Sequence, residues 1–267
     1  MKTVLAPIDF SEASANALSF AAELCKRTDA GLVIIHIMHK EGDEAETTSK
    51  LEAIQSELKE TFGSDLKCEG SFAHGNLIPT LKKIIAVQRP DLVVMGTKGA
   101  NGLKTIIGSN TVKLIGNTRV PVLVIPEVAR FGNFLRNEKN RIVLATDLEE
   151  LENDNALEVL KEIASFIIEP KIRVLSVRPK DTILPDVKRM ERDSLLSFFN
   201  PEIESERFTV FSNNVISGIN FYLNKKQDVG LLAMIARDSG RLIQKHYTRE
   251  MASHTHLPLL VLHESKN

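Results

Sequence analysis

The sequence repeats itself at a nearly constant spacing, and this repeat constrains the fold more than any other feature. The segment RIVLATD, ending at Asp147, follows TVLAPID, ending at Asp9, by 138 residues. LPLLVL around Pro258 follows VPVLVI around Pro121 by 137 residues, and the same spacing separates DVGLL from DLVVM. A period of this length is that of a whole small domain. We therefore predict two domains of one fold, joined head to tail.

Within each repeat, short apolar runs alternate with segments of helical periodicity. The apolar runs predict buried strands, and the segments with one apolar face predict helices, the first of them capped by Ser11. Continuous apolar strands separated by helices are typical of a parallel sheet covered on both faces, so we expect an α/β fold with two tandem doubly wound domains. In the first repeat the predicted strands are 3–8, 32–38, 66–73, 92–95 and 120–125, and the predicted helices are 11–28, 47–61, 77–87 and 109–115.

The alternation stops between the repeats. Residues 126–140, PEVARFGNFLRNEKN, combine asparagines, a glycine and mixed charges. Such a composition favours an irregular connection. We predict a first domain at residues 1–126, a linker at 127–140 and a second domain at 141–264.

Composition and charge exclude several classes of protein. The 34 basic and 35 acidic residues give no whole-chain positive field for nucleic acid. No apolar run approaches the roughly 20 residues of a membrane helix. Cys25 and Cys68 lie far apart without a Cys-x-x-Cys spacing, which indicates free thiols in a reducing compartment. We expect a cytoplasmic protein that binds neither nucleic acid nor membrane.

The stretch MGTKGANGLKTIIGSN, at 95–110, contains four glycines directly after a predicted strand. At the 137-residue spacing the second repeat keeps the flanking strands but none of these glycines. Glycine lets a ligand approach the backbone, and open α/β sheets bind ligands at the carboxyl ends of their strands. We interpret the stretch as a phosphate-binding loop in the first domain, with Lys98 supplying charge and Ser109 a hydroxyl at a helix start. The alternative is a flexible loop with a Gly-Ser helix cap.

Other motifs are weaker. The glycine spacing is not that of a Walker loop, no Gly-x-Gly-x-x-Gly opens the first helix, and no nucleophile is paired with a base. Asp9 ends a strand at the ligand edge, where it suits a purine or ribose hydroxyl, or else it is a cap for the helix that starts near Ser11. His36 lies in an apolar run and is expected to bond to backbone. His254 and His256 have no third ligand nearby, so no metal site is expected there.

On these residues the chain resembles the universal stress protein family in its tandem two-domain form. The resemblance rests on VLAPIDFSEAS at 4–14, LVIIHIM at 32–38 and GTKGANGLKTIIGSNTVKLIGNTRVPVLVIP at 96–126. Nucleotide-binding members have Gly, two residues, Gly, nine residues, then Gly-Ser or Gly-Thr. The first spacing fits here, whereas only eight residues precede Gly108. The resemblance implies, in each domain, a five-stranded parallel sheet in the order 3-2-1-4-5.

The resemblance also implies a binding site for an adenine nucleotide, ATP, ADP or AMP, in the first domain. Any Mg²⁺ would be held by the phosphates rather than by a protein cage. No residue is assigned a catalytic role. By position, the residues near adenine and ribose are Pro7, Ile8, Asp9 and Ile37, and those near ribose and phosphates are Met95, Gly96, Lys98, Gly99, Gly108, Ser109, Asn110 and Thr111.

Three functions are compatible with this pattern. A non-catalytic or regulatory nucleotide-binding stress protein fits best. A slow ATPase would have only Asp9 as a candidate base, and a nucleotide-free scaffold would bind a protein or an apolar ligand through the second domain. Because family members pair their last strands across a dimer, 120–125 and 257–262 are expected to pair within the chain as a pseudo-dimer, with a homodimer as a further possibility.

Overall fold

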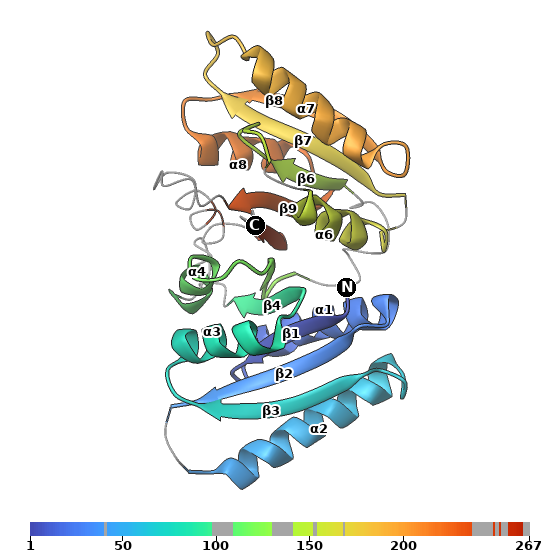
Figure 1. The fold of residues 1–267 in the computed structure, drawn as a ribbon, viewed down its shortest axis with the longest axis vertical. Helices are drawn as coiled ribbons and strands as arrows, with labels where there is room; N and C mark the ends of the chain where they lie inside the picture. The colour runs from blue at the N-terminus through green and yellow to red at the C-terminus, as the bar shows by residue number, and fades with distance from the viewer. Residues whose placement is uncertain are drawn as a thin grey trace. The chain divides into compact units, whose positions relative to one another are not determined.

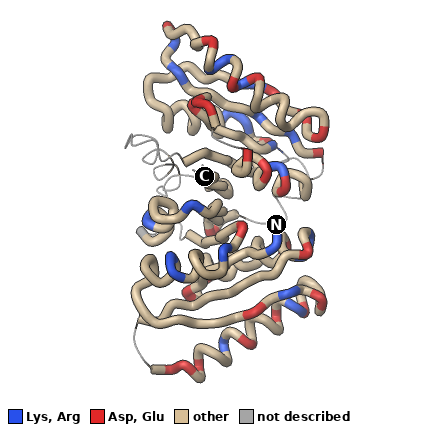
Figure 2. Tube along the Cα trace, in the orientation of Figure 1, with Lys and Arg blue, Asp and Glu red and all other residues tan. Residues whose placement is uncertain are grey.

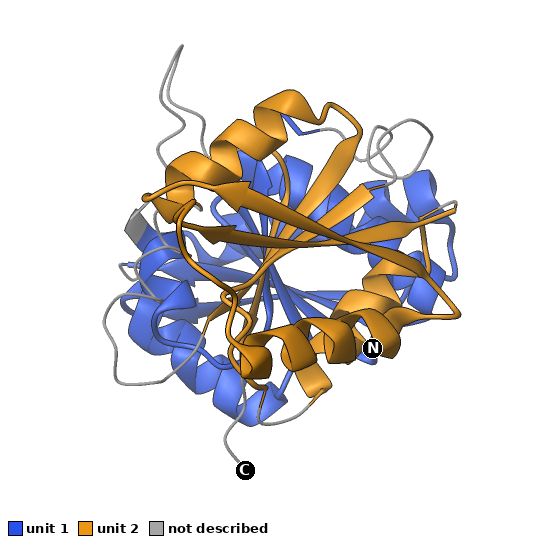
Figure 3. Ribbon diagram, turned by 90° about the horizontal axis from the view of Figure 1, so that it is seen from above, with its two compact units in different colours: residues 1–129, 252–256 blue, residues 130–251, 257–267 orange. Residues whose placement is uncertain are grey.

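The structure, a computed structural model, describes residues 1–39, 42–97, 109–129, 141–151, 154–167, 169–236 and 256–263, together with 248 and 251. The chain divides into two compact units, shown in different colours in Figure 3. Unit 1 comprises residues 1–129 with 252–256, and unit 2 comprises 130–251 with 257–267. Only 127–129 of the predicted linker lie among the described residues, so the proposed linker boundaries stay a prediction.

Unit 1 is a parallel sheet with helices between its strands (Figure 1). Its strands lie in the order β3-β2-β1-β4-β5, as predicted. Right-handed crossovers place α1 and α2 on one face and α3 and α4 on the other, and each of these pairs packs together. The elements are β1 (Thr3–Ile8), α1 (Glu12–Thr28), β2 (Gly31–Met38), α2 (Glu44–Phe62), β3 (Cys68–His74), α3 (Leu77–Gln88), β4 (Leu92–Thr97), α4 (Ser109–Ile115) and β5 (Val122–Pro126).

The sequence explains how α1 is placed in unit 1. Ser11 caps the helix by accepting a hydrogen bond from the Ser14 N–H, as predicted, and Asp29 ends it in the left-handed conformation. The buried face of α1 is rich in alanine, so the helix backbone comes close to β1 and β4. Cys25 on this face is a free thiol, as is Cys68, and burial raises the pKa of Cys25 to about 12.

Unit 2 has the same architecture. Its strands lie in the order β8-β7-β6-β9-β10, which is the 3-2-1-4-5 order of unit 1. The prediction of two doubly wound repeats is therefore confirmed. The elements are β6 (Arg141–Ala145), α6 (Asn155–Ala164), β7 (Lys171–Arg178), α7 (Asp186–Phe199), β8 (Glu204–Phe211), α8 (Val215–Lys225), β9 (Val229–Ala236) and β10 (Leu259–His263).

The strand pairing shows that structurally equivalent residues of the two units are not all separated by the same number of residues. The Val93 N–H donates to the Pro121 carbonyl, and the Leu232 N–H donates to the Pro258 carbonyl. Leu232 therefore occupies in unit 2 the position that Val93 occupies in unit 1. These two residues are 139 positions apart in the sequence, whereas Pro121 and Pro258 are 137 apart. By the same register Gly96 is matched by Ile235 rather than by Ala233, because β9 carries extra residues beside an irregularity in its pairing with β6. The matching residue is still not a glycine.

Charge is mixed in both units. Figure 2 shows basic and acidic residues interspersed along the described trace of each unit. No helix within the described ranges is both long and apolar enough to cross a membrane.

Candidate functional site

A cavity of about 230 Å³ lies at the carboxyl ends of β1 and β4. These strands are neighbours at the point where the strand order reverses, which is where open α/β sheets bind ligands. The first turn of α1 and the starts of α3 and α4 complete the walls. The lining residues are Pro7, Ile8, Asp9, Ser11, Ala13, Ser14, Leu77, Met95, Gly96, Thr97, Asn110 and Thr111.

The cavity brings together most of the described residues that were predicted for a site. Ile37 is buried in β2 and does not line the cavity. Lys98, Gly99 and Gly108 lie outside the described residues, and for Ser109 only the backbone, at the start of α4, is described. The predicted residues that line the cavity are Pro7, Ile8, Asp9, Met95, Gly96, Asn110 and Thr111.

Asp9 organises the loop between β1 and α1. Its Oδ1 accepts hydrogen bonds from the backbone N–H of Ser11, at 3.1 Å, and from the Ser11 hydroxyl. Its own N–H donates to the Ser14 hydroxyl at 3.4 Å. Asp9 thus holds Ser11, which is the cap of α1, so the alternative that Asp9 itself caps the helix is wrong. Asp9 also lies on the cavity wall.

His36 is bonded to backbone, as predicted. Its Nδ1 lies 2.9 Å from the Ile8 carbonyl oxygen, and its ring packs against Phe10 with centroids 4.5 Å apart. Phe10 has a φ of 60°, which is strained for a residue with a side chain. The contact with His36 therefore helps to hold the loop after β1 in this conformation.

Thr97 is a cavity residue that the sequence prediction missed. The residue is 2% exposed, and its Oγ1 has no hydrogen-bond partner in the part of the chain that the structure describes. A buried hydroxyl without a partner is costly and rare in a folded protein. The residue was missed because β4 was predicted to end at Met95, whereas the strand continues to Thr97. A threonine following the apolar run was the available signal.

Comparisons with known proteins bear on the family of the first unit and on the fold. The sequence pattern of the universal stress protein family matches residues 1–126. Residues 1–126 are therefore a domain of this family. No curated protein matches the sequence.

Three solved structures share the fold over nearly the whole chain, and at these identities they show the fold alone. A universal stress protein from Archaeoglobus fulgidus DSM 4304 is 19% identical, with a TM-score of 0.75 and 98% of each chain covered. A functionally unknown protein from Pseudomonas aeruginosa PAO1 is 16% identical, with a TM-score of 0.70, covering 99% of this chain and 93% of the other. A putative universal stress protein from Pseudomonas aeruginosa UCBPP-PA14 is 15% identical, with a TM-score of 0.66, covering 98% and 93%.

In the universal stress protein domain of unit 1, Gly96 is required by packing. A Cβ at this position would lie 2.1 Å from the Ala13 carbonyl oxygen and 2.5 Å from its carbon. The interpretation that the glycines of residues 95–110 serve ligand binding alone is wrong for Gly96, because packing also requires a glycine there. Unit 2 tolerates a larger residue because its first helix begins ten positions after the end of β6, whereas α1 begins four positions after the end of β1.

The described part of the chain shows no protein cage for a metal ion. Among the residues that the structure describes, no group of three or more His, Cys, Asp or Glu side chains could hold a metal. The described acidic group on the cavity wall is the carboxylate of Asp9.

Proposed function

We propose that the cavity of unit 1 binds an adenine nucleotide, and that the protein is a non-catalytic, nucleotide-responsive stress protein. The observation that carries this proposal is the buried Thr97 hydroxyl on the wall of a cavity at the switch point of the sheet. A ligand with hydroxyl or ring nitrogen groups would supply the missing hydrogen bond. Membership of the universal stress protein family favours a nucleotide as that ligand.

The size of the cavity favours the base and ribose as the enclosed part of the ligand. Its volume of about 230 Å³ lies below the roughly 300–1,000 Å³ of sites that enclose a whole small molecule. Apolar groups of Pro7, Ile8 and Met95 would contact the base, and the Thr97 hydroxyl would bond to a ribose oxygen or a ring nitrogen. Any Mg²⁺ would bind to the phosphates.

The geometry favours binding without hydrolysis. A general base must reach the attacking water with a carboxylate oxygen that is able to accept its proton. Asp9 was the only candidate base, and its Oδ1 already accepts two hydrogen bonds from Ser11. We therefore rank nucleotide binding above ATPase activity.

Isothermal titration of the full chain with ATP, ADP and AMP in the presence of Mg²⁺ tests the proposal. We expect one nucleotide per chain, because the glycine-rich loop occurs only in the first repeat. GTP in a parallel titration tests whether the base is recognised. Absence of heat from all three adenine nucleotides in a folded sample would contradict the proposal.

Replacing Thr97 with valine is expected to stabilise the nucleotide-free protein by about 1 kcal/mol, because it removes a buried hydroxyl that lacks a partner. The same change is expected to weaken nucleotide binding roughly tenfold, since the hydrogen bond to the ligand is lost. Urea denaturation and calorimetry measure the two effects. Thr61→Val, on the exposed surface of α2, is the control and should change neither. Lower stability with unchanged affinity would show that Thr97 has only a structural role.

The assembly of the protein stays a prediction from the sequence. Pairing of the last strands of the two repeats, and a possible homodimer, are expected from the family resemblance. Native mass spectrometry of freshly purified protein would report the oligomer and any bound nucleotide in one spectrum.

A further inference from the structure

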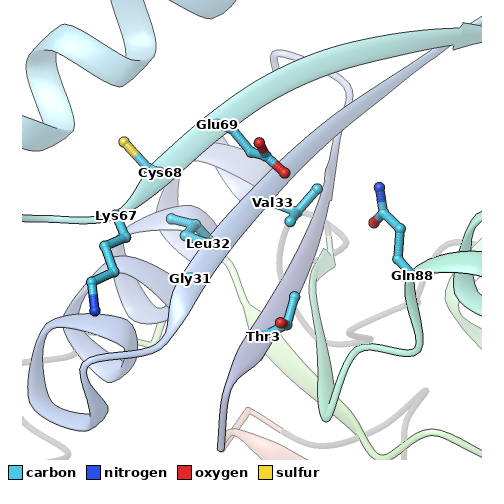
Figure 4. A pocket seen from close by; sticks show the side chains of 8 residues that line it. All are labelled: Thr3, Gly31, Leu32, Val33, Lys67, Cys68, Glu69 and Gln88. Carbon is cyan, nitrogen blue, oxygen red and sulfur yellow. The ribbon is translucent and has the colours of Figure 1, made fainter.

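A second cavity lies at the opposite edge of the unit 1 sheet, at the amino ends of β1, β2 and β3 (Figure 4). Its volume is about 520 Å³. In Figure 4 the Glu69 carboxylate and the Gln88 amide lie on either side of Val33, whereas Lys67 and Cys68 point away from that space. The lining residues are Thr3, Gly31, Leu32, Val33, Lys67, Cys68, Glu69 and Gln88. Nothing in the proposed function uses this cavity.

In unit 2 an arginine side chain occupies the position that is equivalent to this cavity. Val33 is the third residue of β2 and is in register with Glu69, while Arg173 is the third residue of β7 and is in register with Glu206. On their other side, Val33 is in register with Leu5 of β1 and Arg173 with Val143 of β6, and these are equivalent positions of the two first strands. The two repeats therefore keep the glutamate but place valine in one unit and arginine in the other.

The guanidinium of Arg173 is held on three sides in unit 2. Its two terminal nitrogens each donate to a carboxylate oxygen of Asp228 at 2.8 Å, and its Nε donates to Glu206 at 2.9 Å. The ring of Phe208 lies 5.4 Å below the guanidinium. The Arg173 side chain is only 8% exposed, so it fills this place in unit 2.

In unit 1 the two large side chains are missing and the acid is retained. Ser71 stands at the register position of Phe208, as Val33 stands at that of Arg173. The side chain of Glu69 is exposed and makes no hydrogen bond or ion pair with another residue in the described ranges of the chain. The positive charge of Lys67 is already paired with Asp29 at 2.7 Å. The result is a cavity that carries an unpaired negative charge where the other repeat holds a cation.

We propose that this cavity binds a small organic cation with a guanidinium group, and that Glu69 is its counter-ion. A planar guanidinium donates hydrogen bonds to carboxylates from several N–H groups. In unit 2 the Glu206 carboxylate, at the register position of Glu69, accepts such a bond from the Arg173 Nε. The Gln88 side-chain oxygen and the Thr3 hydroxyl are further acceptors on the cavity wall. The hydrocarbon part of the ligand would lie over Val33.

The test uses ethylguanidinium, which mimics an arginine side chain, and ethylurea, its neutral isostere, each titrated into the full chain. Amide chemical shifts of Glu69 and Gln88 report binding. Ethylguanidinium is expected to saturate these shifts with an affinity at least tenfold tighter than that of ethylurea. Glu69→Gln should weaken ethylguanidinium binding at least tenfold, while Glu60→Gln, on α2 away from the cavity, should leave it unchanged.

Val33→Arg provides an independent variant, because it places in unit 1 the cation that unit 2 carries. It should abolish ethylguanidinium binding while the circular dichroism spectrum stays that of the parent protein. Equal binding of the two ligands, unchanged affinity in Glu69→Gln, or retained binding in folded Val33→Arg would overturn the proposal. Nucleotide titrations are independent of this result, since the two cavities lie at opposite edges of the sheet.

Discussion

The Gly96→Ala variant is expected to lose about 3 kcal/mol of unfolding free energy, at the upper end of the usual cost of overpacking a core. The added methyl would meet the backbone of Ala13, whose carbonyl oxygen lies 2.1 Å from the built Cβ. Backbone cannot move aside as a flexible side chain does, so the whole start of α1 must shift. The buried alanine face of α1 packs on β4 and β1, and this shift opens that packing.

Gly31→Ala is the matched control for this variant. The heavy atom nearest to its built Cβ, the Lys2 carbonyl oxygen, is 3.8 Å away, which is ordinary van der Waals contact. It is expected to change stability by less than about 0.5 kcal/mol. Urea denaturation at constant m-value measures both variants. Equal midpoints for the two would show that α1 yields freely, and the packing argument for Gly96 would then be wrong.

Strand and helix positions followed well from the sequence because periodicity and apolar runs depend on local residues. Ser11 was identified as the helix cap from its position alone, and the structure agrees. The register of β9 could not be predicted from the sequence. The residues of β9 are displaced by two positions from the sequence repeat, whereas the segment around Pro258 keeps the spacing of the repeat. A sequence repeat aligns residues that look alike, whereas hydrogen bonds decide which residues stand at equivalent places.

The candidate site was predicted in part for a similar reason. Asp9 directly follows the apolar run of β1 and Met95 closes the apolar run of β4, and such runs are visible in the sequence. The role of Gly96 was misread because its neighbour Ala13 is distant in the chain, so their close approach leaves no local signal. Thr97 was missed because an unpaired hydroxyl is recognised only when all surrounding groups are known.

Replacing Asp228 with asparagine is expected to reduce stability by about 2 kcal/mol at pH 7, because it leaves the buried guanidinium of Arg173 with a single charged partner. The loss is smaller than the 3–5 kcal/mol typical of a fully buried pair, since the Asp228 and Glu206 side chains are 36% and 41% exposed. Denaturation of both proteins over a range of pH measures the difference. Asp181→Asn, in an exposed loop, is the control and should be neutral.

The difference should depend on pH in a defined direction. Hydrogen bonds from Arg173 hold the pKa of Asp228 below its usual value, although burial opposes this effect. A carboxylate with a lowered folded pKa contributes stability above its unfolded pKa, about 3.9, and loses it as the pH falls through the folded value. The parent protein should therefore keep its advantage over Asp228→Asn from pH 7 to about pH 5 and lose it at lower pH.

A second substitution separates the ion pair from a general effect of position 228. Adding Arg173→Met to Asp228→Asn removes the cation that had lost its partner, so the double variant should be more stable than Asp228→Asn alone. Unit 1 supports this expectation, because it folds around Val33 at the same register position and turns Asp91 to the backbone N–H groups of Lys2 and Thr3. If the double variant were less stable than either single variant, Arg173 would be stabilising unit 2 through its contact with Phe208 rather than through its charge.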